Sequence, residues 1–237
     1  MFVNRAKFSG KKVCLIGPAH TAPDDLKGVD LSRYDYVVRL NRAIEIPCVL
    51  ENGAICEFNT LARSIDGNRA GHMAGHYTEA RLEALEIEIL IFVWGRWRYC
   101  LRMLRHVMEI YGYKRKPSLH IVNPNAVKEI SKRLNGARPS TGFTVLYDLC
   151  KMSLSELHVA GFTFFQTPYI PSYNDKINDE EAARKKIHAM TDNGKNWKHH
   201  AFRERDLAKV IFRECQASGL NITIGPGVDK ALATDVF

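Results

Sequence analysis

Short apolar runs alternate with amphipathic stretches along this chain, and this pattern restricts its fold more than any other feature. The apolar runs, each four to seven residues long, span 12–17, 34–40, 53–58, 87–93, 119–122, 157–160 and 221–224. The amphipathic stretches span 77–86, 98–111, 126–134, 142–152 and 203–218. Buried parallel strands have continuous apolar sequences, whereas helices show apolar residues at helical spacing. We therefore predict an α/β fold with a mostly parallel sheet flanked by helices.

Composition supports one globular core. Of the 237 residues, 46% are hydrophobic and 25% are charged, which excludes a collagen-like or disordered chain. No internal repeat or low-complexity linker divides the sequence, so we predict a single domain over residues 1–237. Residues 166–198 are rich in Pro, Asn and charged side chains, as is typical of a surface loop. We expect them to form a lid that contains a short helix near 179–190.

The overall charge and the cysteines restrict the partners and the compartment. The net charge of +8 indicates an anionic partner such as nucleic acid, a membrane surface or a phosphorylated small substrate. Six Cys, none of them in a Cys-x-x-Cys pair, indicate reduced thiols and a cytoplasmic protein. The chain has no run of 18 apolar residues and no signal-peptide core at its first residues, so we expect no membrane span.

The first candidate motif lies at the ends of the first two apolar runs. Gly17 ends the first run, and a glycine there lets a ligand approach the backbone closely. The segment matches neither a dinucleotide fingerprint nor a Walker A loop. Asn41 follows the second run and offers an amide with two donors and an acceptor. A plain glycine turn next to a surface asparagine would have the same local sequence.

The second candidate motif is Arg-Pro-Ser-Thr-Gly at 138–142, directly before an apolar helical stretch. Ser140 and Thr141 are suited to cap that helix, and Pro139 restricts the entry of the chain. The first turn of a helix presents free N–H groups and a positive dipole end. Arg138 adds a permanent positive charge that can hold a carboxylate or phosphate. The segment therefore predicts an anion site, with an ordinary capped helix as the alternative.

The third candidate motif is a histidine pair followed by a glutamate. His199 precedes Glu204 by five residues, near the start of a predicted helix. A neutral imidazole is the natural base at neutral pH, and a carboxylate can orient it. Two exposed histidines on a charged helix would have the same local sequence, and His200 is a second candidate base.

Taken in order, the three segments resemble the sialyl motifs of sialyltransferases, glycosyltransferase families 29 and 42. Residues 14–43 resemble the large motif. Residues 138–162 resemble the small motif, with Pro-Ser-Thr-Gly, a helix and then His-Val-Ala-Gly-Phe, and 199–204 resemble the very small motif. The resemblance implies a single Rossmann-like domain of the variant GT-A kind. It implies an inverting enzyme that moves sialic acid from CMP-sialic acid to a glycan or glycolipid hydroxyl, without a cofactor or metal.

The resemblance also implies roles for individual residues. The catalytic residues would be His199 as the general base, Glu204 and Arg138. The donor-binding residues would be Gly17, His20, Asn41, Asn59, Ser140, Thr141, Gly142, Gly161, Tyr169 and Tyr173. His20 stands near the place where mammalian members have an asparagine after the first strand. Tyr169 and Tyr173 are the nearest candidates for contacts to the leaving phosphate.

Several alternatives stay open from sequence. CMP-Kdo carries the same nucleotide and carboxylate, so a Kdo transferase of this fold would use the same residues. A basic nucleotide-binding protein without transferase activity would share the anion site.

Nucleic acid is not expected as a partner, because the basic clusters at 96–99 and 114–116 fit a solvated helix and loop. Peripheral membrane contact fits a lipid-linked acceptor. His72 and His76 lack the Glu of a zinc hydrolase motif, so no metal is expected. The chain fits a cytoplasmic enzyme at the membrane, or a Golgi lumenal domain separated from its anchor.

Overall fold

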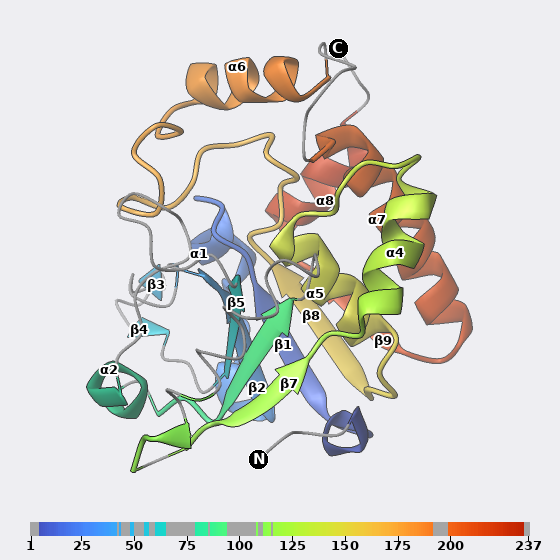
Figure 1. The fold of residues 1–237 in the computed structure, drawn as a ribbon. Helices are drawn as coiled ribbons and strands as arrows, with labels where there is room; N and C mark the ends of the chain where they lie inside the picture. The colour runs from blue at the N-terminus through green and yellow to red at the C-terminus, as the bar shows by residue number, and fades with distance from the viewer. Residues whose placement is uncertain are drawn as a thin grey trace.

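A twisted parallel sheet forms the centre of the molecule (Figure 1). The computed structural model describes residues 5–41, 43, 48–49, 55–56, 60–64, 79–84, 86–93, 108, 111–114, 116–191 and 199–234. Within them, seven strands follow the order β7-β6-β5-β2-β1-β8-β9, and every neighbouring pair is parallel. These strands are β1 (Lys12–Ile16), β2 (Tyr36–Leu40), β5 (Thr60–Ser64), β6 (Ile89–Val93), β7 (Ser118–Ile121), β8 (Glu156–Ala160) and β9 (Asn221–Ile224). A separate antiparallel pair consists of β3 (Cys48–Val49) and β4 (Ile55–Cys56).

Helices connect the strands and cover both faces of the sheet. They are α1 (Ala22–Asp25), α2 (Glu79–Ala84), α4 (Pro124–Arg133), α5 (Thr141–Cys150), α6 (Glu180–Thr191), α7 (Ala201–Ala217) and α8 (Pro226–Ala233), with 3-10 turns η1 (Arg5–Phe8) and η2 (Leu31–Arg33). Successive side chains of β1 point to opposite faces. Val13 and Leu15 pack in the larger core with α4, α5, α7 and α8, whereas Cys14 and Ile16 pack in a second core with α1 and α2.

This architecture confirms the predicted α/β fold with a parallel sheet. Six of the seven apolar runs contain a strand of the sheet, and the run at 53–58 is the exception. Within this run the structure describes Ile55 and Cys56, which form the short β4, and the sheet strand β5 begins after the run, at Thr60. The sequence of β5, Thr-Leu-Ala-Arg-Ser, has no apolar run, and it is a strand because it pairs with both β2 and β6. The sequence did not predict α1 or α8, and most of the helix predicted at 98–111 lies outside the described residues.

The strand order places a topological switch point at β1. From β1 the chain builds outward through β2, β5, β6 and β7, and then returns to β8 on the other side of β1. In open parallel sheets, ligands bind in the crevice outside the carboxyl ends of the strands at such a point. The topology therefore places a candidate site where β1 and β8 end.

Two glycines allow the ends of β1 and β8 to approach each other. A Cβ atom on Gly17 would lie 2.2 Å from the carbonyl oxygen of Gly161, and one on Gly161 would lie 2.6 Å from that of Gly17. Gly161 also has a left-handed backbone, with φ of 65°. Both positions therefore require glycine for packing, before any ligand is considered.

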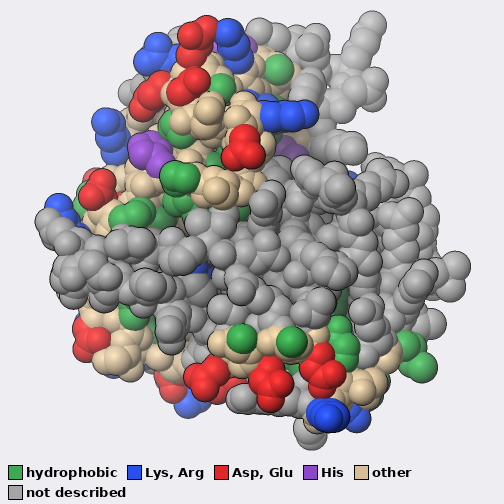
Figure 2. All heavy atoms as spheres, turned by 90° about the vertical axis from the view of Figure 1, so that its left-hand side faces the viewer, with side chains coloured by type: hydrophobic (Ala, Val, Ile, Leu, Met, Phe, Trp, Pro, Cys, Tyr) green, Lys and Arg blue, Asp and Glu red, His purple; other side chains and the backbone are tan. Residues whose placement is uncertain are grey.

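The segment predicted as a lid crosses the carboxyl edge of the sheet and leads into α6 (Figure 1). Its first part is attached to the loop after β1, because the Ile170 N–H donates to the Pro18 carbonyl (2.9 Å) and the His20 N–H to that of Pro168 (3.0 Å). Figure 2 shows side chains of both charge signs over α6, and Glu181 pairs with Lys185 there at 2.5 Å. The action of this segment as a lid and the single domain over 1–237 stay predictions.

Two further sequence expectations concern thiols and membrane spans. Cys14, Cys150 and Cys215 are buried free thiols. In the part of the chain that the structure describes, no helix combines the length and the apolar character needed to cross a membrane.

Candidate active site

A cavity of about 250 Å³ opens at the carboxyl ends of β1, β2 and β8, at the switch point. Its walls are the loops after these strands, the first turn of α5, and His199, which lies two residues before the start of α7. The predicted site residues that line it are Asn41, Arg138, Ser140, Thr141, Gly142, Gly161, Tyr169, Tyr173, His199 and Glu204. Residues from 41 to 204 in the sequence therefore converge on one cavity.

Of the three remaining predicted site residues, Gly17 and His20 do not line this cavity, and Asn59 lies outside the described residues. Gly17 packs against Gly161 and is not part of the cavity wall. His20 is exposed, with Nδ1 3.2 Å from the Pro168 carbonyl oxygen, so it helps to hold the segment after β8. Asn59 lies outside the described residues, as do His72, His76 and the cluster at 96–99.

The first turn of α5 forms one wall of the cavity. Ser140 is its N-cap, and its Oγ accepts a hydrogen bond from the Phe143 N–H at 3.2 Å. A Cβ atom on Gly142 would lie 2.8 Å from Cδ1 of Leu40, so glycine lets this turn pack against the end of β2. Among the residues that the structure describes, nothing accepts from the N–H groups of Thr141 and Gly142.

Two further donors beside this turn are available to an anion. The Thr141 hydroxyl and the Arg138 guanidinium have no hydrogen-bond or ion-pair partner within the described part of the chain. Both side chains are half-buried and line the cavity. A helix N-terminus with a hydroxyl and a guanidinium is suited to hold a carboxylate or a phosphate.

Glu204 has a different contact from the one expected. Its carboxylate accepts from the Ser140 N–H (2.6 Å) and the Ser140 hydroxyl (2.7 Å), so it positions Ser140 at the start of α5. Glu204 is only 1% exposed, and burial raises its pKa to about 7 although both hydrogen bonds act to lower it. Because the Ser140 hydroxyl donates to Glu204, the Thr141 hydroxyl is the better placed of the two to bind a ligand.

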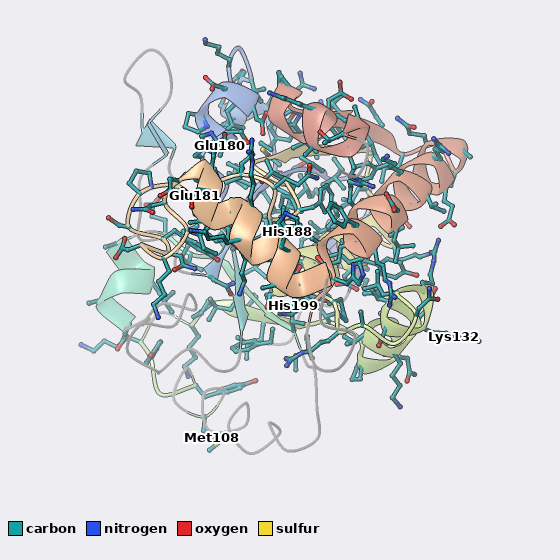
Figure 3. The ribbon with its side chains drawn as sticks, turned by 90° about the horizontal axis from the view of Figure 1, so that it is seen from above. Met108, Lys132, Glu180, Glu181, His188 and His199 are labelled. Carbon is teal, nitrogen blue, oxygen red and sulfur yellow. The ribbon has the colours of Figure 1, made fainter. Side chains whose placement is uncertain are left out.

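His199 lies two residues before the start of α7 and lines the cavity, and Figure 3 shows it where α6 and α7 meet. Its Nδ1 is 3.0 Å from the Arg138 carbonyl oxygen. A carbonyl oxygen only accepts, so this contact assigns the proton of the neutral ring to Nδ1 and the lone pair to Nε2. That tautomer is the one a general base needs.

His200 has a structural contact instead. It is the N-cap of α7, and its Nδ1 accepts from the Arg203 N–H at 3.4 Å. Burial lowers its pKa, and it does not line the cavity. Of the two histidines left open by the sequence, the geometry favours His199 as the base.

Tyr169 and Tyr173 close the cavity from the segment after β8. Their ring centroids lie 5.0 Å apart, and they pack with Ala43 and Ile170. Burial raises the pKa of both phenols, that of Tyr173 to about 12. Both hydroxyls therefore stay protonated at neutral pH and can donate hydrogen bonds.

Sequence reasoning missed Asp25, which holds the back of the site together. It is 2% exposed, and its carboxylate accepts from the N–H groups of Gly161 (2.7 Å) and Gly227 (2.5 Å). It thereby joins the end of β8 to the first turn of α8. An aspartate two residues after Pro23 in a short polar segment has no local pattern that would reveal this role. Among the described residues, no three His, Cys, Asp or Glu side chains gather as a metal site.

Comparison with known proteins identifies the fold. No family model and no curated protein sequence matches the chain. The monofunctional α-2,3-sialyltransferase Cst-I from Campylobacter jejuni aligns with a TM-score of 0.58 at 10% identity, over 100% of this chain and 86% of that one. CstII from the same organism gives 0.53 at 12% identity over 93% and 87%, and a mammalian sialyltransferase gives 0.52 at 14% over 94% and 72%. The chain therefore has the fold of these sialyltransferases.

Proposed function

We propose that this chain is an inverting glycosyltransferase that moves a CMP-activated 2-keto acid sugar, sialic acid, to a hydroxyl group of a glycan acceptor. The observation that carries the proposal is the arrangement of the first turn of α5, Arg138 and His199 around one cavity at the switch point of this fold. Solved structures that share this fold support a CMP-sugar donor and a glycan acceptor as the substrate class. CstII binds CMP and the analogue CMP-3FNeuAc, and the mammalian enzyme binds Gal-beta-1-3GalNAc-ortho-nitrophenol.

The anion site suits such a donor. A CMP-activated 2-keto acid sugar carries a carboxylate on its anomeric carbon and a phosphate beside it. The Thr141 hydroxyl, the N–H groups of Thr141 and Gly142 and the Arg138 guanidinium are available to these two groups. As the bond from the anomeric carbon to the phosphate oxygen breaks, its electron pair moves to the phosphate. Donors that are already in place stabilise that charge in the transition state.

His199 supplies the complementary chemistry on the acceptor side. Its Nδ1–H is held by the Arg138 carbonyl, so Nε2 can take the proton of the acceptor hydroxyl as the new bond to the anomeric carbon forms. Attack from the face opposite to CMP inverts the anomeric centre. The net charge of +8 would assist the approach of the anionic donor. In this proposal the side chains named here stabilise the charge, and no metal or cofactor takes part.

The test is to measure CMP release from CMP-sialic acid and from CMP-Kdo, with and without a lactose acceptor and with and without EDTA. We expect release from CMP-sialic acid that is insensitive to EDTA. Release from CMP-Kdo alone would assign the donor to Kdo, and binding of CMP without turnover of either donor would indicate a nucleotide-binding protein.

Substitution of the two histidines tests the assignment of the base. We expect His199→Ala to lower turnover by at least about 100-fold and to leave CMP affinity nearly unchanged, because general-base catalysis contributes that much. His200→Ala is the matched control, and we expect it to keep turnover but to lose about 1 kcal/mol of stability as a helix cap. Full turnover in His199→Ala would refute this assignment.

A further inference from the structure

The candidate active-site cavity extends from the switch point along the carboxyl edge of the sheet. Its described lining residues reach from Gly161, directly after β8, to Val93 at the end of β6. In the order of the sheet, β1, β2 and β5 lie between β8 and β6, so four strand spacings separate the two ends of the cavity. At about 4.8 Å for each spacing, these ends lie roughly 19 Å apart. The cavity therefore has room for more than the anion site.

The end of the cavity at β6 is apolar. Val93 lies on the same face of the sheet as Ile91, because side chains alternate along a strand, and Leu40 lies on that face at the end of β2. Val127 of α4 and Phe143 of α5 complete the wall, since both line the cavity and pack with the same core. We call Leu40, Val93, Val127 and Phe143 the apolar recess.

The apolar recess is open to the cavity and adjoins the anion site. Val93 and Val127 are half-buried, whereas Leu40 and Phe143 are almost fully buried. The two valines therefore present the apolar surface that a ligand can still cover. A Cβ atom on Gly142 would lie 2.8 Å from Cδ1 of Leu40, so the recess begins directly beside the first turn of α5.

The order of these features along the cavity orients the donor. In this class of fold a nucleotide binds at the switch point, where β1 and β8 end. The first turn of α5 is the place proposed above for the carboxylate of the sugar. A sugar ring held there has the switch point on one side and the apolar recess on the other. Substituents of the ring that point away from the nucleotide therefore reach the recess.

We propose that the apolar recess binds the N-acyl group of the donor sugar, and this inference rests on the function proposed above. Val93 and Val127 thereby select an N-acylated 2-keto acid sugar over one that carries only hydroxyl groups. Burying one methyl group in an apolar pocket changes kcat/KM by about 10-fold or more. A hydroxyl group at the same place would lose hydrogen bonds with water. Because Kdo has no acyl group, the recess favours sialic acid over Kdo.

Three donors and matched valine substitutions in the full chain test this selection. The donors are CMP-sialic acid, its deaminated analogue with a hydroxyl in place of the N-acetyl group, and CMP-Kdo. Val93→Thr and Val127→Thr keep the shape of the side chain but replace one methyl group with a hydroxyl. Val29→Thr is the control, because Val29 is also half-buried against a core but does not line the cavity.

We expect the wild-type kcat/KM for CMP-sialic acid to exceed that for the deaminated analogue, and that for CMP-Kdo, by about tenfold. Val93→Thr and Val127→Thr should each lower these ratios roughly 3- to 5-fold, and Val29→Thr should leave them unchanged. A wild-type ratio near one, or ratios unchanged in both cavity variants, would overturn the proposal. A raised acceptor KM at unchanged ratios would also overturn it and assign the recess to the acceptor.

Calorimetry provides a second measurement, which does not depend on turnover. The probes are CMP and CMP-3FNeuAc, the substrate analogue that CstII binds. We expect the two cavity variants to weaken binding of CMP-3FNeuAc roughly 3- to 5-fold and to leave CMP binding unchanged. Equal weakening of both probes would overturn the proposal, because it would place the nucleotide in the recess. A wild-type protein that binds CMP-3FNeuAc but turns over no donor would refute the proposed function alone, and the weakening in the variants would then still decide the role of the recess.

Discussion

Glu204 provides the strongest quantitative test of the site. It is buried, and no Lys, Arg or His of the described residues forms an ion pair with it. Burial raises its pKa from an ordinary 4.5 to about 7. The folded protein therefore binds more protons than the unfolded chain between these two values. The stability that this group contributes is complete below pH 4.5, and it is lost as the pH rises through 7. At about 1.4 kcal/mol per pH unit, the loss amounts to roughly 3 kcal/mol.

Glu204→Gln removes this titration and keeps the shape of the side chain. The amide oxygen of glutamine can accept from the Ser140 N–H, and its NH₂ can donate to Ser140 Oγ, so the start of α5 stays in place. Urea unfolding at pH 5 and pH 8 measures the effect. We expect the wild-type protein to lose about 2–3 kcal/mol more than the variant between these two pH values.

The matched control is Glu214→Gln on the same helix. Glu214 is 47% exposed and pairs with Arg133 at 2.8 Å, so its replacement should change stability by less than about 1 kcal/mol. The same pH dependence in the wild-type protein and in Glu204→Gln would refute the reasoning, because it would show that Glu204 is ionised throughout.

We also expect CMP affinity to fall between pH 6 and pH 8 only in the wild-type protein, since an ionised Glu204 disfavours an anion at the first turn of α5.

Two further predictions concern the anion site and the contact behind it. Thr141→Val should weaken CMP binding about tenfold in calorimetry without lowering stability, because the Thr141 hydroxyl has no partner among the described residues. Ser140→Ala should cost about 2–3 kcal/mol in urea unfolding, because it removes the helix cap and one partner of a buried carboxylate. Equal effects of both substitutions on CMP binding would contradict this division of roles. Asp25→Asn should lower stability by about 2 kcal/mol, because its NH₂ group would face a buried N–H of Gly161 or Gly227, and an unchanged unfolding midpoint would show that these contacts carry no energy.

Sequence patterns predicted those parts of the structure that depend on neighbouring residues. Burial on both faces makes a parallel strand continuously apolar, so β1, β6 and β8 were recognisable from their residues alone. A Ser-Thr-Gly segment before an apolar helix indicated an N-cap at Ser140 or Thr141, and in the structure the cap is Ser140. The strand β5 escaped detection, since its mixed residues form a strand only between two partners.

The sequence by itself determined six of the seven sheet strands, the capped start of α5 and the residue types available for an anion site. The tertiary structure alone decided which side chains meet. It brought Glu204 to Ser140 rather than to His199, and joined Asp25 to Gly227 across 202 positions of sequence. Local periodicity records whether a residue is buried. It does not record the distant partner, because that partner depends on how strands from the whole chain assemble into one sheet.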